Sequence, residues 1–214
     1  MGVARLALSA KGFPQRAGAV ARFYLDGLIA AGLAALLLTT FVIGTFYIPS
    51  VSMVPTLQVR DVLLVDEIAY HLHSPQEGNI SVFRPPLDPA GSDFVKRIIG
   101  VPGDTIAISD GAVYRNGTAL HEPYENQAPR YDLAIREYGI YVDGKRLDPR
   151  AAEIPPRSSW QAPNRIPGDF YFVLGDNRNY SEDSHVWGFV PARNFVGRAF
   201  LILWPRNRLA VLTK

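Results

Sequence analysis

The feature that most constrains this chain is an uncharged, apolar run over residues 27–48, close to the N-terminus. At about 1.5 Å of rise per residue, a helix of these 22 residues would be roughly 33 Å long, enough to cross a hydrocarbon core about 30 Å thick. A cleavable secretory signal is the alternative, but its apolar core is usually only about 7–15 residues and ends in a small-residue cleavage site, which residues 45–49 lack. We therefore expect a retained transmembrane anchor over residues 23–48.

The charges around this run predict its orientation. The first 22 residues carry a net charge of +4 and the rest of the chain −2, which together give the +2 of the whole sequence. By the positive-inside rule, residues 1–22 are expected to form a cytoplasmic basic tail, and everything after the anchor to lie outside the cytoplasm. Because the basic excess is juxtamembrane, membrane lipid is the expected partner, and no nucleic-acid partner is expected.

Residues 49–214 are long enough for one domain with its own core. The chain has no cysteine, which excludes disulfides, thiolate catalysis and zinc-thiolate sites. Short segments with period-two alternation or β-branched residues, bounded by Gly, Pro or Asp, predict a mostly β domain with few helices. These segments are residues 61–65, 79–83, 94–99 and 170–174.

A local repeat predicts two β-hairpins. Residues 113–120 and 140–147 share a β-branched residue, a Tyr, an Asn-Gly or Asp-Gly turn and a Leu in register. Two copies are too few for a solenoid, so we expect them to belong to one β excursion over residues 105–168. The polar stretch between them, residues 122–138, is expected to be a surface loop.

Ser52 follows the anchor by four residues and is a candidate nucleophile. A Ser-His-Asp triad would use one of the four histidines as its base. A metal site is not expected at His71 and His73, because no further ligands follow them in the sequence. Lys96 is a second candidate base, since it lies inside an apolar strand pattern, and burial could lower its pKa from about 10.4 to about 7–8. From the pattern alone, a solvated Lys96 on the outer face of a strand is the favoured interpretation, and spacing does not bring it to Ser52.

Four blocks, in order along the chain, resemble those of bacterial type I signal peptidases, also called leader peptidases. They are PSVSMVPTL at residues 49–57, GNISVF at 78–83, KRIIGVPGD at 96–104 and GDNRNYSEDSHVWG at 175–188, and residues 196–200 resemble the final strand of the family. The resemblance implies an antiparallel β catalytic domain with an inserted excursion. It also implies a membrane-bound serine endopeptidase that needs no cofactor and removes signal peptides from secreted preproteins.

The same resemblance implies a role for each matched residue. Ser52 matches the nucleophile and Lys96 the general base of a Ser/Lys dyad, which works through an acyl-enzyme ester. Ser50, together with the Ser52 backbone N–H, matches the donors that stabilise the oxyanion. Ser181 matches a serine that hydrogen-bonds the lysine, and Asp183 a supporting carboxylate.

Substrate recognition is also implied by the resemblance. Small apolar pockets would accept alanine-like residues before the scissile bond, as in an Ala-x-Ala site; the matched positions are Phe46, Ile48, Leu57 and Val95. The edge formed by Asp93, Phe94 and Val95 would pair with the extended substrate backbone. From the anchor and its flanking charges, the expected location is the cell (inner) membrane, crossed in a single pass. The sequence leaves the oligomeric state open, with a monomer favoured.

Two positions depart from the family pattern: Asn79 stands where Asp is usual, and His185 where Arg is usual. A His185 charged near Asp183 would make activity more sensitive to pH near pH 6–7, and we expect His185→Arg to alter the pH–rate profile. The turn 176–178 is interpreted as structural, with side-chain to backbone bonds of its own.

Two other functions stay open from the sequence. One is a specialised peptidase of the same Ser/Lys type, such as one that matures a conjugation pilin. The other is a membrane-anchored β module that binds secreted peptides without cutting them, which predicts binding without turnover.

Overall fold

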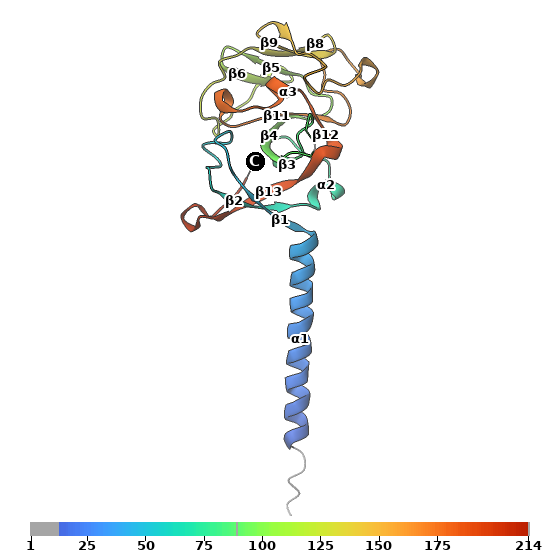
Figure 1. Cartoon of the computed structure of the whole chain (residues 1–214), viewed down its shortest axis with the longest axis vertical. Coiled ribbons are helices and arrows are strands. Elements are labelled where there is room, and N and C mark those ends of the chain that lie inside the picture. Colours follow the sequence, from blue (N-terminus) through green and yellow to red (C-terminus); the bar gives the residue numbers. More distant parts are fainter. Residues whose placement is uncertain (1–12, 89, 214) are drawn as a thin grey trace, which may run out of the picture. The chain divides into compact units, whose positions relative to one another are not determined.

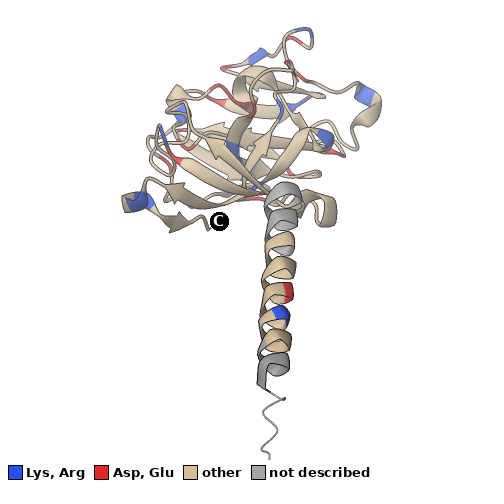
Figure 2. Ribbon diagram, turned by 60° about the horizontal axis from the view of Figure 1, so that its bottom comes forward, with Lys and Arg blue, Asp and Glu red and all other residues tan. Residues whose placement is uncertain are grey.

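The computed structural model describes residues 13–88 and 90–213, with side chains described for residues 18–33 and for most of the chain from residue 42 onward. The chain divides into two units after Val42. The first unit contains helix α1, Phe13–Phe41. Its described middle part carries Arg22 and Asp26, one basic and one acidic residue (Figure 2). Within the part of the chain that the structure describes, no helix combines the length and the apolar character needed to cross a membrane.

The expected helix over residues 23–48 is wrong at its C-terminal end. The helix stops at Phe41, and Ile43–Tyr47 form strand β1, which pairs antiparallel with strand β2, Val62–Asp66. Residues 42–47 are rich in β-branched and aromatic side chains, which favour a strand once a partner strand supplies the hydrogen bonds. The β unit therefore begins at Ile43 and not at residue 49.

The larger sheet of the second unit holds the predicted strands. Its strand order is β1-β2-β13-β3-β4-β11-β12, with β14 paired to β13, and its pairs are antiparallel. The four segments predicted as strands and the expected final strand are confirmed. Beyond β1 and β2, the members are β3 Ile80–Phe83, β4 Phe94–Gly100, β11 Phe170–Leu174, β12 Val190–Pro191, β13 Phe195–Trp204 and β14 Ala210–Val211.

A second, six-stranded sheet is built from the excursion, in the order β10-β9-β8-β5-β6-β7. Both predicted hairpins are confirmed, and their turn residues have positive φ, for example 52° at Asn116 and 79° at Gly117. The surface-loop prediction for residues 122–138 is wrong in part, because Leu133–Arg136 form β8 with Leu133 and Ile135 buried. The strands are β5 Ile106–Ser109, β6 Ala112–Arg115, β7 Thr118–Ala119, β8, β9 Gly139–Val142 and β10 Lys145–Arg146.

One apolar cluster joins the two sheets. It contains Ile99 and Phe172 from the larger sheet and Ile108, Val113 and Ile140 from the smaller one. Within the second unit, the smaller sheet lies at one end, and β1, β2 and β13 lie at the other (Figure 1). The helices here are short: α2 Ala69–Leu72, α3 Ser184–Trp187, η1 Arg157–Ser159, η2 Arg178–Tyr180, η3 Ala192–Asn194 and η4 Arg206–Arg208.

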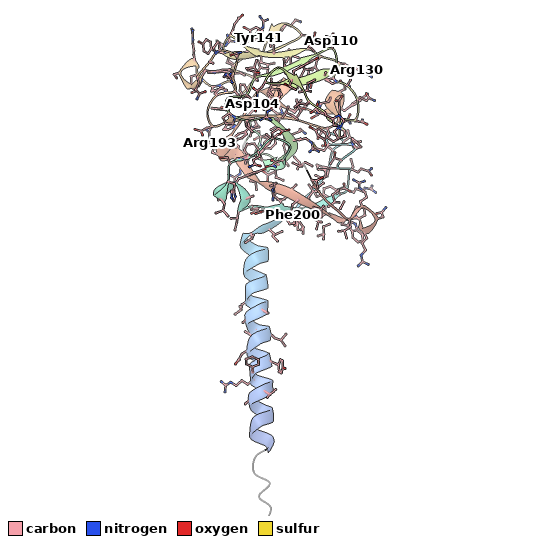
Figure 3. All side chains as sticks on the ribbon, turned by 180° about the vertical axis from the view of Figure 1, so that it is seen from behind. Asp104, Asp110, Arg130, Tyr141, Arg193 and Phe200 are labelled. Carbon is pink, nitrogen blue, oxygen red and sulfur yellow. The ribbon has the colours of Figure 1, made fainter. Side chains whose placement is uncertain are left out.

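Asp104 ties the start of the excursion to its first hairpin. Its carboxylate accepts hydrogen bonds from Val101 N, Arg115 Nε and Asn116 Nδ2 at 2.9, 2.7 and 2.7 Å. In the view of Figure 3, Asp104 lies below Tyr141 of β9 and above Phe200 of β13. The excursion is therefore fixed to the larger sheet by polar as well as apolar contacts.

Candidate active site

Ser52 and Lys96 meet in the second unit, although 44 positions separate them in sequence. Lys96 Nζ lies 2.7 Å from Ser52 Oγ. Lys96 comes from β4 and is 5% exposed, and Ser52 comes from the turn after β1 and is 8% exposed. The solvated Lys96 that the pattern alone favours is therefore wrong.

Burial lowers the pKa of Lys96 from its ordinary value, because desolvation disfavours the ammonium form. The negative charges of Asp183, Glu182 and Asp176 act in the opposite direction and raise it. The Phe94 ring also opposes the effect of burial, because its centroid lies 5.6 Å from Lys96 Nζ and the face of an aromatic ring attracts a cation. Desolvation is the largest of these effects, so the pKa of Lys96 is lowered overall, toward the neutral amine that a general base requires.

The turn after β1 that carries Ser52 is fixed by backbone hydrogen bonds and by packing against an apolar cluster of the core. Leu57 N donates to Met53 O at 2.9 Å, and both side chains pack with Ile48 in one apolar cluster. Ile48 N donates to Asp61 O at 2.9 Å, which closes the loop at its base, and Arg208 forms an ion pair with the Asp61 carboxylate at 2.9 Å. Ser52 is therefore fixed on both sides in sequence.

Ser50 lies at the exposed edge of the site, with its Oγ 3.2 Å from Ser52 Oγ. The Ser52 backbone N–H donates to no group in the described part of the chain. One hydroxyl and one unengaged backbone N–H are thus available near the Ser52 hydroxyl. Both are donors of the kind that stabilises an oxyanion.

The two predicted supporting residues, Asp183 and Ser181, differ in their hydrogen bonding. Asp183 is fully buried and accepts from Gly175 N at 2.9 Å and from the backbone N of His185 at 3.2 Å, which caps α3. Ser181 Oγ is buried and has no hydrogen-bond partner among the described residues, so the implied bond to Lys96 is not formed. A Cβ atom added at Gly175 would collide with Ser181 Oγ and with the Ser52 carbonyl oxygen, so these groups are close.

Side chains of the turn 176–178 bond to neighbouring segments of the chain. Asp176 receives Arg97 Nε and Nη2 at 2.8 Å each and Thr56 Oγ1 at 2.5 Å. Arg178 forms a two-pronged ion pair with Glu122 of the excursion, at 2.8 and 2.9 Å. The interpretation as a structural turn agrees with these contacts, and one bond of the predicted side-chain to backbone kind is present, from Arg178 Nε to Gly175 O at 3.0 Å. The turn also bonds to the segment around Ser52, to β4 and to the excursion.

A cavity of about 340 Å³ opens beside Ser52 and Lys96. Five of the six predicted substrate-binding residues line it: Phe46, Ile48, Asp93, Phe94 and Val95. The prediction for Leu57 is wrong, because this side chain is fully buried in the core below, and Met53 lines the cavity instead. Tyr180 and Glu182 also line it and were missed, although their positions on either side of Ser181 could have indicated them.

The edge of β4 beside this cavity is open. On one side, Phe94, Val95 and Lys96 pair with β3, as in Phe94↔Phe83. On the other side, β11 begins its pairing only at Leu174↔Arg97, so within the described residues these three positions have no second strand. An extended peptide could add here by backbone hydrogen bonds.

Residues 21–204 match the family described as "Signal peptidase, peptidase S26". The chain belongs to this family. As a signal peptidase I it is a serine endopeptidase, and it acts on preproteins that carry signal peptides.

Relatives of this signal peptidase agree over most of its length. "Probable signal peptidase I-2" of Synechocystis sp. is 41% identical over 190 residues, which cover 87% of this chain and 74% of that protein. "Signal peptidase I" of Leptolyngbya laminosa is 39% identical, over 88% and 83%, and that of Pseudomonas aeruginosa is 33% identical, over 83% and 71%. A crystal structure of a signal peptidase I from Enterococcus faecalis is 29% identical, with a TM-score of 0.41; the match covers 59% of this chain and 97% of that one.

The two departures of this signal peptidase have separate surroundings. Asn79 Oδ1 accepts from Gln76 N at 3.1 Å and from Tyr70 OH at 3.5 Å, which caps the turn before β3. His185 Nδ1 lies 2.6 Å from Asp183 Oδ1, and its ring stacks on Tyr131 with a centroid distance of 4.3 Å. The pH effect expected from His185 stays a prediction.

Among the described residues, no group of three or more His, Cys, Asp or Glu side chains is placed to hold a metal ion.

Proposed function

We propose that this signal peptidase cleaves preproteins with a dyad of Ser52 and Lys96. The observation that carries the proposal is the 2.7 Å contact between Lys96 Nζ and Ser52 Oγ in a buried site. The neutral amine takes the Ser52 proton as Oγ attacks the scissile carbonyl, and the resulting ammonium protonates the leaving amine. Water then hydrolyses the ester on Ser52, with Lys96 again acting as the base.

The oxyanion of the tetrahedral intermediate is bound in this mechanism by the Ser52 N–H and the Ser50 hydroxyl. The unengaged Ser52 N–H and the position of Ser50 beside Ser52 Oγ support this assignment. Loss of one such donor costs about 2.7–4 kcal/mol in comparable sites.

The cavity and the open strand edge support the proposed specificity for small residues. An extended substrate would pair with residues 94–96 while its alternate side chains point into the cavity lined by Phe46, Ile48 and Val95. Apolar walls with limited volume favour alanine-like side chains, so we expect cleavage after Ala-x-Ala sites.

A membrane anchor completes the proposal. The apolar part of α1 and the basic residues before it support a helix in the lipid, with the N-terminus in the cytoplasm and the second unit outside it. The apolar segment of a preprotein lies in the same bilayer, so anchoring would raise the effective concentration of substrate at Ser52.

The test is cleavage of a detergent-solubilised precursor with an Ala-x-Ala site by the intact protein and by Ser52→Ala and Lys96→Met variants. Only the parent should turn over. Ser109→Ala and Lys145→Met make the same changes at exposed positions and should keep full activity. Activity that survives either dyad change would refute the dyad. A folded parent that binds but never cuts the precursor would indicate a binding module.

A further inference from the structure

We propose that Asn177 is a positioning residue that orients the Ser52 backbone N–H toward the substrate carbonyl oxygen. The inference rests on the proposed role of Ser52 as nucleophile. Among the described residues, Asn177 forms no hydrogen bond with Ser52 Oγ or Lys96 Nζ, and it links the excursion to the peptide groups around Ser52.

Asn177 binds the peptide groups on both sides of Ser52. Its Nδ2 donates to Val51 O at 3.1 Å, and its backbone N donates to Ser52 O at 3.1 Å. Asn177 is 5% exposed, so water competes little for these bonds. The nucleophile is therefore held by its two flanking carbonyl groups, from the side of the turn 176–178.

The bond to Val51 O determines where the Ser52 N–H points. Val51 C=O and Ser52 N–H belong to one planar trans peptide unit, in which the two bonds point in opposite directions. A donor that fixes the oxygen on one side thus directs the N–H to the other. Because the Ser52 N–H has no partner among the described residues, it remains available to a substrate oxygen.

Asn177 is oriented in turn by the excursion. Asn126 Nδ2 donates to Asn177 Oδ1 at 3.2 Å, and Asn126 N donates to Asp176 O at 3.0 Å. Because Oδ1 already accepts from Asn126, the amide of Asn177 presents its donor end to Val51. Asp176 is itself fixed by the buried ion pair with Arg97. The chain of contacts runs from the excursion to the peptide before Ser52.

A positioning role and a purely structural role can be told apart by the bound species that each one affects. If Asn177 only stabilised the fold, its loss would weaken all ligands alike. If it orients an oxyanion donor, the loss falls on tetrahedral species and leaves ground-state binding intact.

The experiment compares Asn177→Ala and Asn177→Asp with Asn126→Ala in the full-length protein. Asn177→Asp keeps the size of the side chain and the acceptor for Asn126, but removes the donor to Val51. Asn179→Ala is the matched control, because Asn179 also bridges to the excursion, with Oδ1 accepting from Arg130 N at 2.9 Å and Nδ2 donating to Ala128 O at 3.0 Å. It has no bond to the Ser52 turn among the described residues.

The readouts are kcat and KM on a cleavable peptide and the affinities of two inhibitors. One is a peptide aldehyde ending in alanine, which forms a tetrahedral adduct with a serine, and the other is an uncleavable reduced-amide peptide. Both Asn177 variants should lose about 10²-fold in kcat and in aldehyde affinity, with KM and reduced-amide affinity within about twofold. Asn126→Ala should lower kcat and aldehyde affinity by about threefold to tenfold, because Asn126 is exposed and water can replace part of its hydrogen bond to Asn177.

Unchanged kcat in Asn177→Asp, or equal weakening of both inhibitors in the Asn177 variants, would overturn the proposal. If Asn177→Ala does not fold, as judged by its thermal melt, the results for Asn177→Asp and Asn126→Ala still test the proposal. An active Ser52→Ala variant would instead refute the proposed dyad, which is a separate outcome. A loss in Asn179→Ala as large as in Asn177→Asp would also overturn the specific role of Asn177.

Discussion

At the scale of single residues, the proposed mechanism depends on the protonation state of Lys96. Burial lowers its pKa, and three carboxylates, Asp183, Glu182 and Asp176, raise it. Of these, Glu182 is exposed and lines the cavity, so its charge can be removed without opening the core. The balance between burial and charge can therefore be tested at one position.

Glu182→Gln should move the acid limb of the kcat/KM profile to lower pH. In the proposed mechanism Lys96 acts as a base only when neutral, so activity rises as pH rises through the pKa of Lys96. The charge of Glu182 stabilises the ammonium form, and its removal lowers that pKa. The profile should be measured at low salt, since screening weakens the effect of an exposed charge. Glu137→Gln, at an exposed turn of the smaller sheet, should leave the limb in place, and a shift of the Glu182→Gln limb to higher pH would contradict the prediction.

At the scale of elements, the end of β11 and the Ser52 turn are packed backbone against backbone. Gly175, directly after β11, leaves no room for a side chain, because its added Cβ would meet the Ser52 carbonyl and Ser181. The position of Ser52 therefore depends on a close approach of two segments that are distant in sequence.

Gly175→Ala should lower kcat by about 10²-fold, since a displacement of about 1 Å at a reacting group can cost that much. It should also reduce stability by about 1–3 kcal/mol, the usual cost of overpacking. Gly168→Ala is the control, because its Cβ would meet only the flexible end of Gln161. Full activity in Gly175→Ala would show that the Ser52 turn can shift without loss.

Elements with strong local signals could be predicted from the sequence, whereas long-range contacts could not. The Asn116-Gly117 turn and the β-branched strands carry their own conformational preference, so both hairpins and the main strands were predictable. The end of α1 and strand β8 were not, because their conformation depends on the partners β2 and β5. The meeting of Ser52 with Lys96, and the burial of Leu57 below the cavity, likewise arise from the packing of the larger sheet.

At the scale of the whole molecule, the chain consists of an N-terminal helical unit and a β unit with its own sheets and core. The boundary after Val42 keeps β1 with the β unit, together with the cavity residues Phe46 and Ile48. The proposed anchor and the proposed chemistry can thus be separated by truncation at that boundary.

A chain that begins at Ile43 should fold and cleave a soluble peptide with a kcat/KM close to that of the full chain. It should cleave a precursor embedded in lipid vesicles more slowly, because the gain from sharing a bilayer is lost. A chain that begins at Pro49 lacks β1, exposes the buried Leu63 and Val65 of β2, and should melt at lower temperature. Equal rates of the full and Ile43 chains on embedded precursor would argue against a role for anchoring.

The open edge of β4 is only three residues long, from Phe94 to Lys96. Long free edges invite chains to pair with one another and aggregate, and a short one avoids that hazard. A short edge also limits how firmly any peptide is held once its bond is cut. In the proposed mechanism the brevity of this opening would therefore favour turnover, because a severed signal peptide has few backbone hydrogen bonds to break before it leaves.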